Sequence, residues 1–100
     1  MPNNNIQTNK GSIKKIKFED LLFKPHHYGF GTQAVIEFDN GYSVSVLFGE
    51  LFYSNGIDTY EFAVLKDGEL DYNNPVADGD VRGYLKKKEL MELVNQVKEL

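Results

Sequence analysis

The chain has 100 residues, 41% of them hydrophobic and 13% aromatic, and its formal net charge at pH 7 is −4. This length and composition predict one domain with enough apolar side chains to fill a core. The absence of cysteine excludes disulfides, thiolate catalysis and cysteine-ligated metals, and the lack of a membrane-length apolar run or a basic-then-apolar leader predicts a cytoplasmic protein.

The first 12 residues are rich in Asn, Lys and Gly and carry almost no apolar side chains. This composition predicts a disordered tail over residues 1–12 and a single folded domain over residues 13–100. We expect an edge strand over residues 13–18, and such a strand would allow two copies of the chain to pair as a homodimer.

The only histidines, His26 and His27, are adjacent and follow Pro25. Adjacent side chains point to different sides of an extended chain, and no third ligand is anchored nearby, so the pattern predicts no metal site. Residues 28–31 are rich in glycine but lack the lysine and the strand–loop–helix context of a phosphate-binding loop. His26, His27 and Tyr28 remain candidate binding residues.

Residues 32–48 contain two alternating segments around the turn Asp39-Asn40-Gly41, which predicts an antiparallel hairpin. A two-residue loop would mix apolar and polar side chains on each face. A three-residue loop, with Gly41 in the left-handed conformation, gives one nearly continuous apolar face. We therefore predict the pairs Phe38–Tyr42, Ile36–Val44, Ala34–Val46 and Thr32–Phe48. Asp39 and Asn40, at the tip, are candidate binding residues.

The connection after this hairpin contains Leu51, Phe52 and Tyr53 in succession. Loops held by a rigid scaffold often carry function. Two interpretations remain open: these side chains fold back over the sheet, which we favour, or they form a contact surface.

Residues 60–72 repeat the alternating pattern around the turn at residues 66–68. A three-residue loop would pair Val64 with Leu70 and Phe62 with Tyr72, and would place Tyr72 in the core. Pro75 follows the return strand and ends it, because proline cannot donate to a strand ladder. The two hairpins together predict an antiparallel meander of about four to five strands.

Residues 86–100 contain no Gly or Pro, and their apolar side chains recur at helical spacing: Leu90, Val94, Val97 and Leu100. This predicts a C-terminal helix that covers the apolar face of the sheet, and hence an α+β fold class. The first turn holds Lys86, Lys87 and Lys88, although the helix dipole favours acids there, so the start of the helix is poorly marked.

Charge is segregated along the chain. Residues 1–30 hold five lysines against two acids, residues 31–80 ten acids against one lysine, and residues 81–100 five basic residues against three acids. An acidic sheet between two basic ends would suit a basic partner surface, although acidic turns that serve only solubility explain the same pattern.

Catalytic and nucleic-acid-binding patterns are weak. Asp78-Gly79-Asp80 lacks the spacing and the terminal Glu of a calcium loop, and turn chemistry explains it better. No serine lies in a recognisable nucleophile setting, which predicts that the protein is not an enzyme and needs no cofactor. Six Tyr and seven Phe would suit base stacking, but the strands are acidic, which argues against nucleic acid as a partner.

Several segments together resemble the pattern of small proteins encoded by tailed bacteriophages and prophages. They lie over about residues 16–100 and are Phe18-Glu19-Asp20-Leu21, Phe23-Lys24-Pro25-His26, Gln33-Ala34, residues 38–46 and 60–65, Gly68, Pro75-Val76, Asp80-Val81 and Gly83-Tyr84-Leu85. The resemblance implies an accessory product that acts on the host or its defences in the host cytoplasm, and it transfers no catalytic residues. The chain departs from this pattern at Lys86, where related chains would have a helix-capping Thr or Ser.

Two classes of function follow as hypotheses. In the first, the protein binds and modulates a host defence or regulatory protein through the loop at residues 51–53 and the acidic turns. In the second, it sequesters a nucleotide signal between protomers, with lysines from both chain ends neutralising phosphate if those ends meet in space: Lys14, Lys15, Lys17 and Lys86 to Lys88. A minor structural or assembly role is a third alternative.

Overall fold

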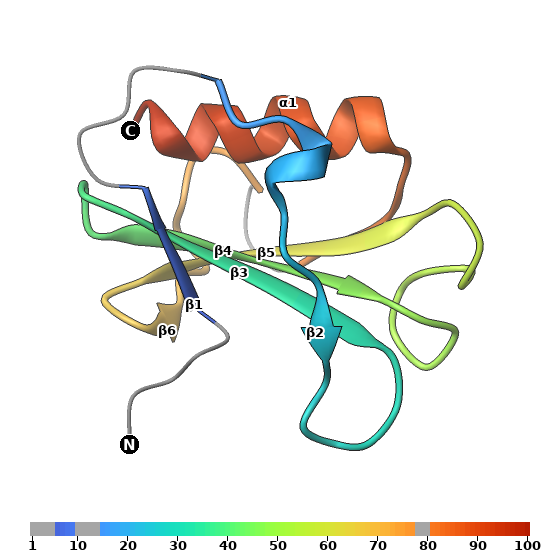
Figure 1. The fold of residues 1–100 in the computed structure, drawn as a ribbon. Coiled ribbons are helices and arrows are strands. Elements are labelled where there is room, and N and C mark those ends of the chain that lie inside the picture. The colour runs from blue at the N-terminus through green and yellow to red at the C-terminus, as the bar shows by residue number, and fades with distance from the viewer. Residues whose placement is uncertain (1–5, 10–14, 78–80) are drawn as a thin grey trace.

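The computed structural model describes residues 6–9, 15–77 and 81–100. Within these ranges, a seven-stranded sheet is covered on one face by one helix (Figure 1), which confirms the predicted α+β class. The elements are β1 (Ile6–Asn9), the 3₁₀ helix η1 (Phe18–Asp20), β2 (Lys24–Pro25), β3 (Thr32–Phe38), β4 (Tyr42–Phe48), β5 (Tyr60–Lys66), β6 (Glu69–Leu70), β7 (Arg82–Leu85) and α1 (Lys87–Lys98).

The centre of the sheet is the antiparallel meander β3–β4–β5, and its first hairpin has the predicted register. Thr32 faces Phe48, Ala34 faces Val46 and Ile36 faces Val44. Gly41 takes a φ of +87°, as the three-residue loop requires. Short strands extend the meander on both sides: β1 and β2 pair with β3, and β6 and β7 pair with β5.

The predicted register of the second hairpin is wrong by one residue. Leu65 pairs with Leu70 and Lys66 with Glu69, so the loop is the two-residue turn Asp67-Gly68. Both residues have positive φ, +51° and +88°, as a type I′ turn demands, and Asp tolerates that conformation. The return strand ends at Leu70, and Tyr72 lies exposed rather than in the core. Phe62 pairs instead with Arg82 of β7.

The N-terminal predictions also need correction. Residues 6–9, assigned to a disordered tail, form β1 and pair parallel with β3; the other residues of that tail lie outside the described ranges. The edge strand expected over residues 13–18 is not formed by its described part. Residues 15–17 have no regular secondary structure and Phe18 opens η1. The Asp78-Gly79-Asp80 turn lies outside the described residues.

The core lies between the meander and α1, whose buried side chains are Leu90, Val94 and Val97. On the sheet side these contact a continuous layer of buried apolar residues: Ala34, Ile36, Phe38, Val44, Val46, Phe62 and Val64. Alternation in the strands and helical spacing in α1 therefore produce one shared core, as the sequence predicts. Within the described ranges, no helix has the length and apolar character needed to cross a membrane.

Two asparagines fix α1 to the rest of the chain. Asn95 Nδ2 donates to the carbonyls of Ile16 and Met91, and Asn95 Oδ1 accepts the Ile16 amide at 2.8 Å. At the other end, Asn40 Nδ2 donates to the Val97 carbonyl at 2.9 Å. The first of these contacts holds the segment before η1 alongside the helix. The second adds a side-chain donor to a carbonyl in the last turn of the helix, which also accepts the Leu100 amide at 3.1 Å.

Candidate functional site

Two loops lie beyond the same end of β3 and β4: the 26–31 loop before β3 and the 49–59 loop after β4 (Figure 1). Their aromatic rings meet. The His26 ring centroid lies 5.1 Å from that of Phe52, and Phe30 lies 5.6 Å from Phe52. His27 and Tyr28 lie 4.3 and 4.7 Å from His26. The fold thus brings together four of the predicted binding residues, His26, His27, Tyr28 and Phe52.

His26 is the buried anchor of the 26–31 loop, with 7% of its surface exposed. Its backbone amide donates to the Gly31 carbonyl at 3.0 Å, and its Nδ1 accepts the Tyr28 amide at 3.2 Å. Burial lowers the pKa of His26, and the nearby His27 lowers it further. The imidazole therefore favours its neutral form and holds the loop closed. Among the described residues, no three His, Asp or Glu side chains gather in a way that would hold a metal ion.

The 49–59 loop is stabilised by hydrogen bonds from its own polar side chains. Ser54 Oγ donates to the Thr59 carbonyl at 2.6 Å and accepts the amides of Gly49 and Gly56. Asn55 Oδ1 accepts three further amides, those of Ile57, Asp58 and Thr59. An ion pair of 2.6 Å between Asp58 and Lys86 connects the loop to the start of α1. These contacts give the loop one defined conformation.

The same loop turns large apolar side chains toward solvent. Leu51 is 72% exposed, Tyr53 57% and Ile57 79%. Of the two interpretations offered by the sequence, folding back applies only to Phe52, which is half-buried against the 26–31 loop. Leu51 and Tyr53 instead lie on the surface.

Tyr84 of β7 extends this exposed surface. Its ring lies 6.4 Å from that of Tyr53, and its amide donates to the Tyr53 carbonyl at 2.9 Å. Its φ of +55° is an unusual conformation for a bulky residue, and it occurs where the pairing of β5 and β7 is irregular. No local pattern pointed to Tyr84 or Ile57, because each stands alone in its segment, and the contact of Tyr84 with Tyr53 is made only in the fold.

Asp39 and Asn40 lie at the other end of the first hairpin, away from these loops. The Asn40 side chain is used within the fold, since it bonds to α1 and its Oδ1 accepts the Tyr42 amide at 3.0 Å. Asp39 lines a small acidic pocket of about 490 Å³ together with Glu37, Ser43 and Asp67. These two predicted residues therefore do not join the other six.

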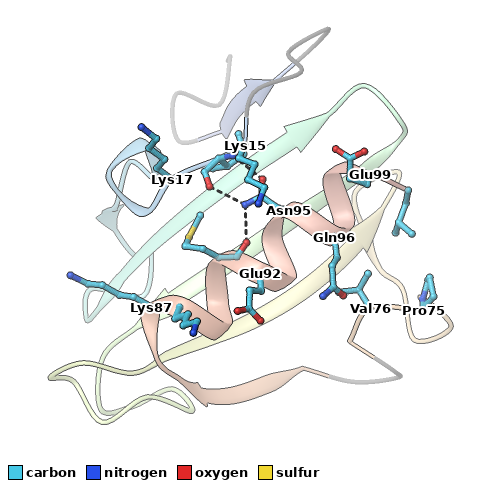
Figure 2. Close-up of a pocket in the computed structure, with 13 residues that line it drawn as sticks. Lys15, Lys17, Pro75, Val76, Lys87, Glu92, Asn95, Gln96 and Glu99 are labelled. Atoms are coloured by element: carbon cyan, nitrogen blue, oxygen red, sulfur yellow. Dashed lines mark hydrogen bonds between the residues drawn. The ribbon is translucent and has the colours of Figure 1, made fainter.

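A separate groove runs over the outer side of α1 (Figure 2) and has a volume of about 980 Å³. It lies between the segment at residues 15–17 and the turn at Pro75-Val76. Lysines from both ends of the chain line it, namely Lys15, Lys17, Lys87 and Lys88. The two basic ends thus meet in space. The hypothesis of a phosphate-binding site required this proximity. In the part of the chain that the structure describes, no Tyr, Phe or His lines this groove.

The structure therefore offers an exposed apolar surface on a rigid loop and a lysine-lined groove, and each includes residues selected from the sequence. Comparison of the chain with models of protein families, with curated proteins and with solved structures finds no match.

Proposed function

We propose that the chain is a non-enzymatic accessory protein of phage type that binds and modulates a host protein through the loop surface. The loop surface comprises the exposed side chains of Tyr28, Phe30, Leu51, Tyr53, Ile57 and Tyr84. One observation carries the proposal: hydrogen bonds from its own Ser54 and Asn55 side chains hold the 49–59 loop, which turns Leu51, Tyr53 and Ile57 to solvent.

This combination is typical of a protein-binding site. Exposed apolar residues that adjoin one another mark interaction surfaces, and Tyr is enriched among the residues that contribute most to binding. A loop already held in one conformation loses little conformational entropy when it binds. The energetic cost of exposing Leu51 and Ile57 is offset once a partner covers them.

Two further parts of the proposal depend on the sequence. The partner is a host defence or regulatory protein in the host cytoplasm, because the chain resembles small phage and prophage proteins. The environment of the two histidines, which are the best general-base candidates, supports a function without catalysis. They stack on each other, and His26 Nδ1 already accepts the Tyr28 amide. The proposal requires no cofactor.

Nucleotide sequestration remains a second candidate because the lysines of the two chain ends line one groove. The aromatic side chains suited to base stacking lie in the 26–31 loop instead. Stacking and phosphate neutralisation are therefore separated within one protomer, and we rank this function below protein binding.

Affinity purification of the tagged protein from host cells, followed by native mass spectrometry, tests both functions. We expect a host protein at fixed stoichiometry, whose recovery falls about tenfold for the double variant Leu51→Ser, Ile57→Ser. The matched control is Leu70→Ser, Tyr72→Ser, which removes an exposed side chain of β6 and one that follows it; β6 lies on the other side of the molecule from the loops (Figure 1).

Three outcomes would contradict the proposal. Equal recovery with both double variants would show that the loop surface is not the contact. A retained mass of nucleotide size, without a protein partner, would favour sequestration. Co-purification with phage particles alone would favour an assembly role.

A further inference from the structure

The groove over α1 has an apolar floor formed by separate parts of the chain. Ile16 comes from the segment before η1, Val76 from the turn after β6, and Met91 from the helix itself. Ile16 is buried, whereas Val76 and Met91 are half-buried and Leu100, at the C-terminal end, is 45% exposed. Methionine adapts to different partner shapes and is common at binding surfaces. The floor can therefore pack against a row of apolar side chains from a partner.

Charge is uneven along this groove. Lys17 and Lys87 lie beside the N-terminal half of α1, and Glu99 lies at its C-terminal end (Figure 2). Among the described residues, four lysines line the groove against two glutamates, although the whole chain carries a net charge of −4. Among the described residues, the ion pairs include none of Lys15, Lys17 and Lys88. An acidic partner would find its opposite charges already gathered there.

The helix itself gives an independent indication of an anionic partner. Lys87 and Lys88 share the first turn of α1 with Glu89, and the positive end of the helix dipole disfavours the two lysines while it favours the glutamate. The residue that precedes them, Lys86, provides no side-chain hydrogen bond to cap the helix. A local arrangement that disfavours the folded chain is expected where binding compensates for it. Carboxylates placed over this end would offset both the lysine charges and the dipole.

We propose that the groove over α1 binds an acidic amphipathic helix of a protein partner, at a site separate from the loop surface. The apolar face of that helix packs on Val76, Met91 and Leu100, and its carboxylates lie over the lysines at the N-terminal half of α1. Helix-in-groove recognition uses such a row of apolar anchors. The described lining residues include no aromatic side chain, which disfavours a nucleobase as the occupant.

Fluorescence polarisation with designed peptides tests this site on the full chain at about 150 mM salt, where weak surface attraction is screened. The probe is a fluorescein-labelled helix of about 16 residues with Leu on one face and Glu on the other. A polyglutamate of equal charge and the same helix with Lys in place of Glu are the comparison probes. We expect saturable binding of the first probe and at least about tenfold weaker binding of both others. The side-chain amide signals of Asn95 and Gln96, which line the groove, should shift in NMR spectra.

Charge reversal locates the contact. Lys17→Glu with Lys88→Glu should weaken binding of the acidic helix about tenfold, whereas Lys24→Glu with Lys66→Glu, outside the groove, should change it less than about twofold. Leu51→Ser with Ile57→Ser should leave it unchanged, which separates this test from that of the loop surface. Circular dichroism of each variant checks that it folds.

Several results would overturn the proposal: no saturable binding of the acidic helix, equal binding of polyglutamate, or equal effects of the two charge reversals. The proposal would also be overturned if the Asn95 and Gln96 amide signals shifted on self-association of the chain or on addition of ATP but did not shift on addition of the peptide.

Discussion

The imidazole of His26 lies in the interior of the 26–31 loop, and its protonation decides how the candidate surface responds to pH. Its Nδ1 accepts the Tyr28 amide, and its ring packs against those of His27 and Phe52. Protonation would remove that acceptor and place a charge in a buried position. The same ring therefore stabilises the loop when neutral and disfavours it when charged.

Because burial and His27 lower its pKa from the usual 6.5, the unfolded chain binds the His26 proton more readily than the folded chain. The contribution of His26 to stability is complete above pH 6.5 and is lost as pH falls through its folded-state pKa. We expect the free energy of unfolding to decrease between about pH 7 and pH 5.5, and His26→Asn to flatten this dependence, since Asn Oδ1 can still accept the Tyr28 amide.

Urea denaturation at several pH values measures this effect. His27→Gln is the control: it removes the smaller cause of the pKa shift and should flatten the dependence only in part. An unchanged pH dependence in His26→Asn would contradict the assignment. Asp58, whose pKa is lowered from 3.8 by its hydrogen bonds to Asn55 and Lys86, titrates below this window.

Among the elements, the two loops depend on each other through a close backbone approach. Gly31 has a φ of +67°, and a Cβ there would lie 2.5 Å from Phe52 Cε2 and 2.9 Å from the Phe48 carbonyl oxygen. Gly29, in the same loop, has a φ of +87° with nothing within 4 Å of such a Cβ. The two glycines therefore separate backbone strain from steric contact between the loops.

Gly29→Ala should cost about 1–2 kcal/mol of stability through its positive φ alone, and Gly31→Ala about 2–5 kcal/mol because Phe52 must also move. Thermal unfolding of both variants measures the difference. Equal losses would show that the contact between Gly31 and Phe52 does not hold the loops together.

The elements also show which parts of the fold were predictable. The β3–β4 register and α1 follow from local alternation and helical spacing, because each pattern has one buried face. The second hairpin failed because the pattern favoured apolar pairs, whereas Asp67 accepts positive φ and allows a shorter turn. β1 was missed because it pairs in parallel with β3, a strand that lies far from it in sequence.

The candidate site, like the fold, was predictable only in part. Exposed Leu51 and Tyr53 were selected from the sequence because consecutive apolar residues in a connection are unusual. The position of Tyr84 depends on the irregular pairing of β5 and β7, and the lysine groove forms because Asn95 holds Ile16 against α1. Both are contacts between distant segments that no local pattern records. The bond from Asn40 to α1 could not be predicted, because a turn residue and a residue that bonds to a helix end look alike in sequence.

For the whole molecule, the charge segregation of the sequence becomes a spatial arrangement. The acidic middle of the chain forms the strands and their turns, while lysines from both ends gather over α1. The loop surface and the groove thus present different chemistry, one apolar and aromatic and the other apolar and basic. A protein of this size with two such surfaces can contact two partners, or two parts of one partner.

Both surfaces depend on α1, because its buried side chains share one core with the sheet and Lys86, which precedes it, pairs with Asp58 of the 49–59 loop. We therefore expect cooperative unfolding of the whole domain.

Leu90→Ala, at a fully buried position, should cost about 2–5 kcal/mol and lower the melting temperature by about 10 °C or more. Leu100→Ala, which truncates an exposed side chain just after α1, should change stability by less than about 0.5 kcal/mol. Melting curves followed by far-ultraviolet circular dichroism and by tyrosine fluorescence should coincide for both variants. Separate transitions in Leu90→Ala would show that α1 detaches while the sheet stays folded, and the groove would then be a site that opens independently of the loop surface.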